Sequence, residues 1–290
     1  MDHRPLWRRI ADFPFVAMLI ALFALMVGIT IAYIIASEAI ARNRGVGIEV
    51  MFDLVAIPIV LLIYKLVIVR LGQHPRDDLR AAGALRPLAW GLLGGFLVFS
   101  LIVAAAAALG VYRITGPGDL TGMPKALVTA AIFPAISEEI VFRGVLFRWI
   151  EEVGGSWVAL ILTSAFFGAG HLMNPNASTI AAVGIAFEAG VMLGAAYMLT
   201  RSLWLPIGLH AAWNFTQGEI YDIPVSGMPV HGVVDARLCC NPLLTGGGFG
   251  LEASVIAMVV ATLFGLWLLW MAIKRDRLVT PTWLRRCSAA

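Results

Sequence analysis

Long apolar runs separated by short polar segments dominate this sequence and limit it to few folds. A helix needs about 20 mostly apolar residues to cross the hydrocarbon core of a bilayer. The chain is 60% hydrophobic and 13% charged, whereas a soluble domain of this size carries about a quarter charged residues. The sequence therefore predicts an all-α, polytopic membrane protein of about eight transmembrane helices. The expected spans are Phe13–Ile35, Ile48–Val69, Leu88–Tyr112, Ala126–Ile150, Trp157–Met173, Thr179–Thr200, Leu203–Ile220 and Leu251–Ile273.

The basic residues predict how these helices are oriented. Arg4, Arg8 and Arg9 precede the first run, which is longer than the roughly 7–15 apolar residues of a signal peptide, so we expect an uncleaved anchor. With the N-terminus inside, 14 Lys and Arg residues fall on the cytoplasmic side and five on the opposite side, while Lys65 and Arg143 lie within apolar runs. This asymmetry follows the positive-inside rule. It predicts a multi-pass protein of the bacterial inner membrane with both termini in the cytoplasm.

Polar interruptions divide the chain into three expected parts. Residues 1–125 hold the first three helices, residues 126–220 hold a core of helices four to seven, and residues 221–290 hold an external loop, the last helix and a basic tail. The longest interruption, Gly218–Gly250, predicts an external loop that could act as a lid or a re-entrant segment. Three cysteines are too few for a disulfide framework. Because the basic residues lie at the ends of apolar runs, we expect the bilayer as a partner and no nucleic acid.

Ionisable side chains inside a bilayer need an explanation, because each costs about 2.5–3.5 kcal/mol at a helix centre. The clearest group is Ser137-Glu138-Glu139-Ile140-Val141-Phe142-Arg143 in the fourth run. Glu139 and Arg143 are four residues apart, so they share a helix face and can pair. Glu138 is rotated by about 100° from Glu139 and must face elsewhere. We therefore interpret the Glu139–Arg143 pair as structural and Glu138 as chemical.

Two further helices supply candidate partners for Glu138. The fifth run ends in Phe167-Gly168-Ala169-Gly170-His171, which places Phe167 and His171 on one face. The seventh run contains His210-Ala211-Ala212-Trp213-Asn214, which places His210 and Asn214 on one face in the same way. Each helix thus presents an imidazole, and the seventh adds an amide.

Glu138, His171 and His210 allow two kinds of chemistry if they converge. One carboxylate and two imidazoles could hold a divalent metal such as zinc with one open position. Alternatively, Glu138 with His171 could activate a water as general base, while His210 and Asn214 donate hydrogen bonds to the oxyanion of a tetrahedral intermediate. Both schemes hydrolyse a peptide bond. The sequence has no HExxH motif, which excludes an ordinary zincin.

Three motifs in this order resemble those of the CPBP intramembrane proteases, which include the type II CAAX prenyl endopeptidases and bacterial relatives linked to bacteriocin immunity. The motifs are Glu138-Glu139-x-x-x-Arg143, Phe167-x-x-x-His171 and His210-x-x-x-Asn214. The stretch from Gly190 to Asn214 resembles the family as well. The resemblance covers about Ala126–Phe215 and does not extend to the first three helices or the last.

The resemblance implies an all-helical, eight-span fold with a conical catalytic cavity in the bundle. It implies that Glu138 and His171 activate water, and that His210 and Asn214 stabilise the oxyanion. A metal requirement stays open for the family too. The implied substrate is a peptide or protein at the membrane, with a C-terminally lipidated peptide as one form.

Four other charged residues within the predicted spans suggest an alternative. Glu49, Asp53 and Lys65 lie in the second run and Glu188 in the sixth, and no protease motif requires them. Intramembrane charges of this kind also mark proton or ion paths. The alternative is therefore a non-enzymatic transporter, or a bacteriocin-immunity or binding factor. It predicts that Asp53 matters more for function than Glu138.

Overall fold

A computed structural model describes residues 4–42 and 47–287 of the chain. Its α-helices are α1 (Leu6–Ala11), α2 (Pro14–Arg42), α3 (Ile48–Leu66), α4 (Leu85–Ala108), α5 (Met123–Ala126), α6 (Phe133–Glu139), α7 (Arg148–Gly170), α8 (Thr179–Ile185), α9 (Val191–Thr200), α10 (Trp204–Phe215), α11 (Pro242–Thr245), α12 (Val255–Lys274) and α13 (Thr282–Cys287). Four π-helical turns join or extend them, namely η2 (Leu127–Ile132), η3 (Ile140–Phe147), η5 (Ala186–Gly190) and η6 (Thr216–Ile220). Short 3₁₀ turns are η1 (Ile68–Arg70), η4 (His171–Met173), η7 (Gly247–Phe249) and η8 (Leu251–Ala253).

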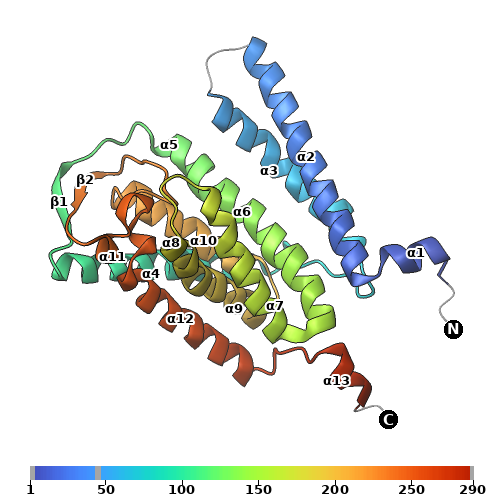
Figure 1. The fold of residues 1–290 in the computed structure, drawn as a ribbon. Helices are drawn as coiled ribbons and strands as arrows, with labels where there is room; N and C mark the ends of the chain where they lie inside the picture. The colour runs from blue at the N-terminus through green and yellow to red at the C-terminus, as the bar shows by residue number, and fades with distance from the viewer. Residues whose placement is uncertain (1–3, 43–46, 288–290) are drawn as a thin grey trace.

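The described residues contain six helical stretches that are long and apolar enough to cross a membrane. One of them, Met123–Met173, has 51 residues and is broken at Gly155, where φ is 76° and ψ is 172°. The chain turns back there, so this stretch holds both the fourth and the fifth predicted runs (Figure 1). The seventh run forms α10, with 12 residues, continued by η6, with five, and is shorter than the usual span of about 20. The all-α, polytopic fold is confirmed, and the number eight stays a prediction.

Several predicted helix ends differ from the structure, and the first helix, expected to end at Ile35, continues to Arg42 as α2. The third run was expected to reach Tyr112, but α4 ends at Ala108 and Tyr112 begins the strand β1 (Tyr112–Pro117), which pairs antiparallel with β2 (Val234–Leu238). The last run was expected from Leu251, but α12 begins at Val255 because Ser254 caps it, accepting a hydrogen bond from the backbone N–H of Ala257 at 3.1 Å. A polar capping residue such as Ser254 thus marks a helix start that hydropathy alone does not locate.

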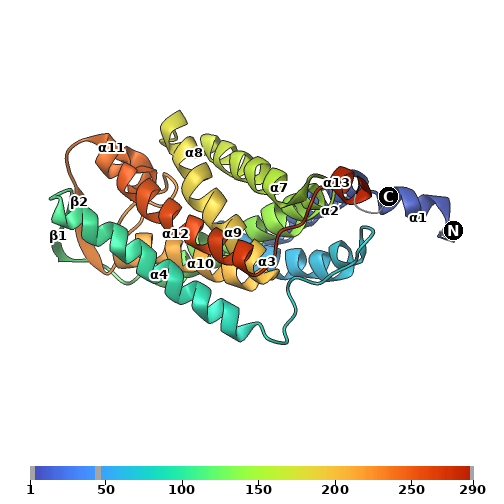
Figure 2. The same ribbon diagram turned by 90° about the horizontal axis from the view of Figure 1, so that it is seen from below.

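Helices α1 and α13 lie at the same end of the bundle (Figures 1 and 2). At this end the buried guanidinium of Arg148 holds the connection between α3 and α4, because it donates to the backbone carbonyls of Leu71, His74 and Arg76 at 3.2 Å each. The paired strands β1 and β2 lie at the opposite end (Figure 2). The side of the membrane on which the two termini lie stays a prediction.

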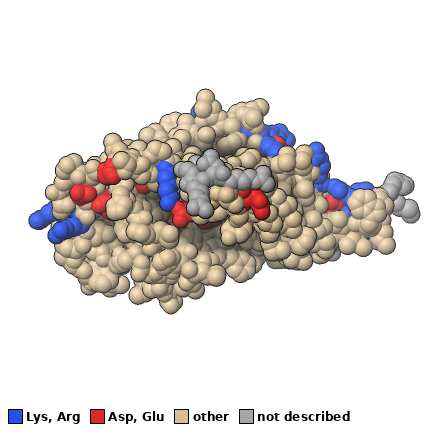
Figure 3. Space-filling model, turned by 90° about the horizontal axis from the view of Figure 1, so that it is seen from above, with Lys and Arg blue, Asp and Glu red and all other residues tan. Residues whose placement is uncertain are grey.

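Small residues bring the central helices together. An added Cβ at Gly91 or Gly95 of α4 would lie 2.4 Å from a backbone carbonyl oxygen of α10, that of Leu205 or Leu209. Gly190 packs in the same way against Ser164 of α7, with 2.8 Å from its would-be Cβ to the Ser164 Cα. Such contacts are the usual way in which membrane helices pack closely. The outer surfaces of α2, α4 and α12 expose large apolar side chains, and most of the face in Figure 3 is uncharged, as a lipid-facing surface requires.

Candidate active site

A buried ionic network connects three helices at the centre of the bundle. Arg143 donates through Nη1 to Oε1 of Glu139 at 2.8 Å, and both side chains are 0% exposed. The other terminal nitrogen of Arg143 donates to the carbonyls of Ala189 at 3.3 Å and Gly190 at 3.2 Å. The expected Glu139–Arg143 pair is therefore present, and it also fixes η5 against η3.

His210 joins this network from α10. Its Nδ1 lies 3.1 Å from the same Oε1 of Glu139. Because an ionised carboxylate can only accept, Nδ1 must carry the proton in this contact. The other ring nitrogen, Nε2, then carries a proton only when His210 is an imidazolium. The neighbouring carboxylate of Glu139 favours that charged form.

Glu138 faces away from the network. It lines a cavity, and it forms no hydrogen bond or ion pair with any residue that the structure describes. It is near enough to interact electrostatically with Arg143 and His210. The π-helical turn η3 begins two residues later at Ile140, and such turns are frequent at functional sites. The two adjacent glutamates thus have separate environments, as their helical rotation predicts.

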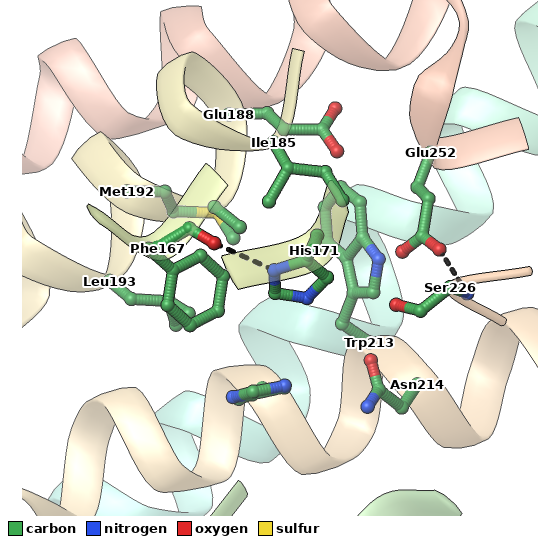
Figure 4. Close-up of a pocket in the computed structure, with 12 residues that line it drawn as sticks. Phe167, His171, Ile185, Glu188, Met192, Leu193, Trp213, Asn214, Ser226 and Glu252 are labelled. Atoms are coloured by element: carbon green, nitrogen blue, oxygen red, sulfur yellow. Dashed lines mark hydrogen bonds between the residues drawn. The ribbon is translucent and has the colours of Figure 1, made fainter. Parts of the chain in front are cut away.

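His171 lies at the end of α7, in the turn η4. Its Nδ1 is 2.7 Å from the carbonyl oxygen of Phe167, and so Nδ1 is the donor. In the neutral ring the second nitrogen is then an acceptor with a free lone pair. Figure 4 shows this nitrogen on the side of the ring that faces Asn214. His171 can therefore accept a proton or a hydrogen bond from a group in the cavity.

Phe167 forms a wall between the two histidines. Its ring centroid is 4.8 Å from that of His171 and 6.1 Å from that of His210. The Arg143 guanidinium lies over the same ring, 4.9 Å from its centroid. The Phe167 ring therefore packs against both imidazoles and against the guanidinium of the buried network.

One cavity of about 690 Å³ brings the four candidate catalytic residues together. Glu138, His171, His210 and Asn214 all line it. Asn214 uses one amide hydrogen for the carbonyl of Ala130 at 2.9 Å, which leaves its second hydrogen for a ligand. The volume falls in the usual range of about 300–1,000 Å³ for ligand sites. The cavity lies between α3, the segment from α5 to α6, α10, and the loop that includes Ser226 and His231.

A metal centre does not fit this arrangement. Within residues 4–42 and 47–287, no three His, Cys, Asp or Glu side chains form a group that could hold a metal ion. Glu138, His171 and His210 line one cavity without converging on a common point of coordination. We therefore assign no step of the chemistry to a metal, and zinc dependence stays a prediction.

The four charges that suggested transport have different environments. Lys65 donates to Asp77 at 2.7 Å, and Glu49 pairs with Lys125 at 2.5 Å. Asp53 and Glu188 are buried and have no hydrogen bond or ion pair with any described residue. Two of the four are thus explained by pairing.

A second, smaller void also lies beside His171, and sequence reasoning missed two of its lining residues, Ser226 and Glu252. It has about 20 Å³, the space of about one water, and is lined by Glu188, Glu252 and Ser226 as well as His171 (Figure 4). Glu252 accepts a hydrogen bond from the backbone N–H of Ser226. The sequence placed Glu252 in the last span, where nothing indicated a contact with the fifth helix.

The central segment matches a known family. Residues 121–216 match the family model described as type II CAAX prenyl endopeptidase Rce1-like. This segment, here called the CPBP core, is therefore similar to the family that the motifs resemble. Over 169 residues it is also 24% identical to the "Putative membrane peptidase YdiL" of Bacillus subtilis (strain 168), covering 55% of this chain and 65% of that relative. No solved structure matches the chain.

The CPBP core contains every residue predicted for the site. Glu138, His171, His210 and Asn214 all fall within the matched residues 121–216, and the family resemblance drawn from the motifs is confirmed. The match leaves out α2, α3 and α12. One wall of the cavity, formed by α3, therefore lies outside the part of the chain that the family model describes.

Proposed function

We propose that this protein is an intramembrane endopeptidase that hydrolyses a peptide bond of a membrane-associated or C-terminally lipidated peptide. The observation that carries this proposal is the single cavity lined by Glu138, His171, His210 and Asn214. An unpaired carboxylate, an imidazole with a free lone pair and two hydrogen-bond donors from α10 are the groups that water-based amide hydrolysis requires.

Each group has one task in the proposed reaction. The Glu138 carboxylate takes a proton from a water, with the free nitrogen of His171 accepting the second hydrogen bond of that water. The water oxygen attacks the carbonyl carbon, and the carbonyl oxygen becomes an oxyanion. Nε2–H of imidazolium His210 and the second amide hydrogen of Asn214 donate to this oxyanion. The proton held by Glu138 then passes to the amide nitrogen as the C–N bond breaks.

Glu139 supports this chemistry without contacting the substrate. Its Oε1 is occupied by Arg143 and His210, and its side chain is 0% exposed and does not line the cavity, so it does not reach the substrate. Its charge keeps a proton on Nδ1 of His210. Nε2 can therefore donate a hydrogen bond only when His210 is an imidazolium with a proton on both ring nitrogens. We therefore assign Glu138 as the base and Glu139 as a positioning residue.

The test uses the full chain in lipid nanodiscs and a library of internally quenched peptides, some carrying a lipid at the C-terminus. We expect cleavage by the wild type and a loss of at least about 100-fold in Glu138→Gln and in His171→Ala, because general-base catalysis contributes about 10²–10⁴-fold. Glu38→Gln is the matched control, since Glu38 is exposed on α2 and does not line the cavity.

Full activity in either cavity variant would refute the assignment. Absence of peptide cleavage, combined with proton-coupled uptake into proteoliposomes that requires Asp53, would favour the transporter instead. Thermal unfolding of each variant in the same nanodiscs separates a loss of catalysis from a loss of fold.

A further inference from the structure

The wall of the active-site cavity is acidic. Four carboxylates line it, those of Glu49, Asp53, Glu138 and Glu219, against one Lys or Arg side chain, that of Lys125. Lys125 is already paired with Glu49, and both are more than half exposed. Asp53, Glu138 and Glu219 therefore have no Lys or Arg partner among the described residues that line the cavity.

Asp53 is the acid on the α3 wall. Its side chain is 5% exposed, lines the cavity, and has no hydrogen bond or ion pair with any described residue. The ring of the preceding residue, Phe52, packs edge-on against Phe133, with 5.5 Å between centroids. This contact holds α3 against the first residue of α6, the helix of Glu138. A buried carboxylate is thus fixed beside the catalytic helix and left without a cation.

Glu219 is the acid on another wall. It lies in η6, which continues the helix α10 of His210 and Asn214. Its side chain is 3% exposed, and Oε2 is buried without a hydrogen-bond partner. The two acids without a Lys or Arg partner therefore line the cavity from different elements, Asp53 from α3 and Glu219 from the extension of α10.

A buried charge without a partner is costly, and a cation that enters the cavity would remove that cost. An inorganic divalent ion does not fit, because no three acidic or histidine side chains among the described residues could hold one. One carboxylate suffices for a guanidinium or an ammonium group, since a guanidinium pairs with a carboxylate through two parallel hydrogen bonds. Asp53 and Glu219 are arranged as separate acceptors of this kind.

We infer that Asp53, with Glu219 as a second acceptor, binds an Arg or Lys side chain of the substrate, so that the protein selects cationic peptide segments. The inference rests on the proposed peptidase function and names its substrate class. It assigns specificity to α3, a helix outside the CPBP core.

The experiment measures binding and cleavage separately. A fluorescent peptide series carries one Arg, moved position by position, and each member is matched by a peptide with citrulline, which has the same shape and no charge. Binding is measured with Glu138→Gln protein in nanodiscs, and cleavage with protein that retains Glu138. For at least one Arg position we expect about tenfold or tighter binding than for its citrulline match, the size of one charge-assisted hydrogen bond.

The variants decide whether Asp53 is responsible. In Asp53→Asn, at least one Arg position that the wild type prefers should bind no better than its citrulline match, whereas Asp53→Glu should keep the preference there. Asp235→Asn is the matched control, because Asp235 is exposed on β2 and away from the cavity. Equal binding of Arg and citrulline peptides at every position by the Asp53-containing protein, or a preference that survives at every preferred position in a folded Asp53→Asn, overturns the inference. Cleavage of neutral peptides without Arg preference leaves the peptidase standing and removes the inference, while Arg preference without any cleavage removes the peptidase.

Discussion

The buried pair Glu139–Arg143 predicts a small effect on stability where a soluble protein would show a large one. Removing one partner of a buried ion pair usually costs about 3–5 kcal/mol. Here the partners lie four residues apart in one continuous helical segment, 2.8 Å from each other. Membrane helices associate after they have formed, so a helix keeps its internal contacts when the bundle opens. The pair persists in both states, and its energy largely cancels from the free energy of unfolding.

The contacts that unfolding does break set the expected magnitude. Arg143 donates to the carbonyls of Ala189 and Gly190 on η5, and polar contacts between membrane helices average about 0.6 kcal/mol each. Arg143→Met should therefore lower the free energy of unfolding by about 1.2 kcal/mol. The coupling between Glu139 and Arg143 should stay below about 0.5 kcal/mol, and the coupling between Glu139 and His210, which lie on different helices, should reach about 0.6–1.7 kcal/mol.

Double-mutant cycles measure both couplings. Glu139→Gln is combined with Arg143→Met in one cycle and with His210→Gln in the other, and unfolding is followed by tryptophan fluorescence during SDS titration in mixed micelles. Far-ultraviolet circular dichroism checks that helices persist. A Glu139–Arg143 coupling above about 2 kcal/mol, or none between Glu139 and His210, would refute the reasoning, because interhelical contacts would then not dominate.

Three further predictions follow from other parts of the structure. Burial raises the pKa of Glu252, so the folded protein holds this proton more tightly than the unfolded chain. Stability should therefore fall as pH rises above the ordinary carboxyl pKa of about 4.3 and through the raised pKa. In thermal unfolding at a series of pH values, Glu252→Gln should show a smaller fall than the wild type. Gly95→Ala should lower the unfolding temperature by an overpacking cost of about 1–3 kcal/mol, because its Cβ would lie 2.4 Å from the Leu209 carbonyl oxygen; an unchanged temperature contradicts the close α4–α10 packing. Peptide cleavage should be unchanged by a metal chelator, and loss of activity restored by zinc would contradict the water-activating glutamate.

Local spacing was enough to predict some of the site. Because Glu139 and Arg143 are four residues apart on one helix, they can pair however the helices pack, and the structure contains this pair. The rotation between Glu138 and Glu139 likewise predicts two environments, which the structure also contains. Helix geometry acts over a few residues, and sequence reports it directly.

Contacts between distant segments could not be predicted in the same way. The bond from His210 to Glu139 joins residues 71 apart in sequence, and no local pattern predicted this contact. Glu219 and Glu252 are ordinary residues until packing places them on a cavity wall, and the sequence marked Asp53 only as a charge within a span, without its place on that wall. The π-helical turns could not be predicted either. A helix that is apolar on every side has no hydrophobic periodicity in its sequence from which a local change of helical pitch could be recognised.

The adjacency of Glu138 and Glu139 has a mechanical consequence. A single peptide unit, with about 3.8 Å between Cα atoms, connects the carboxylate that we propose as the base to the carboxylate that anchors the imidazole of His210. Any tilt or shift of α6 that moves the first must carry the second in the same step. In the proposed reaction, a helix movement that opens or closes the site would therefore shift the base and the anchor of the oxyanion donor together.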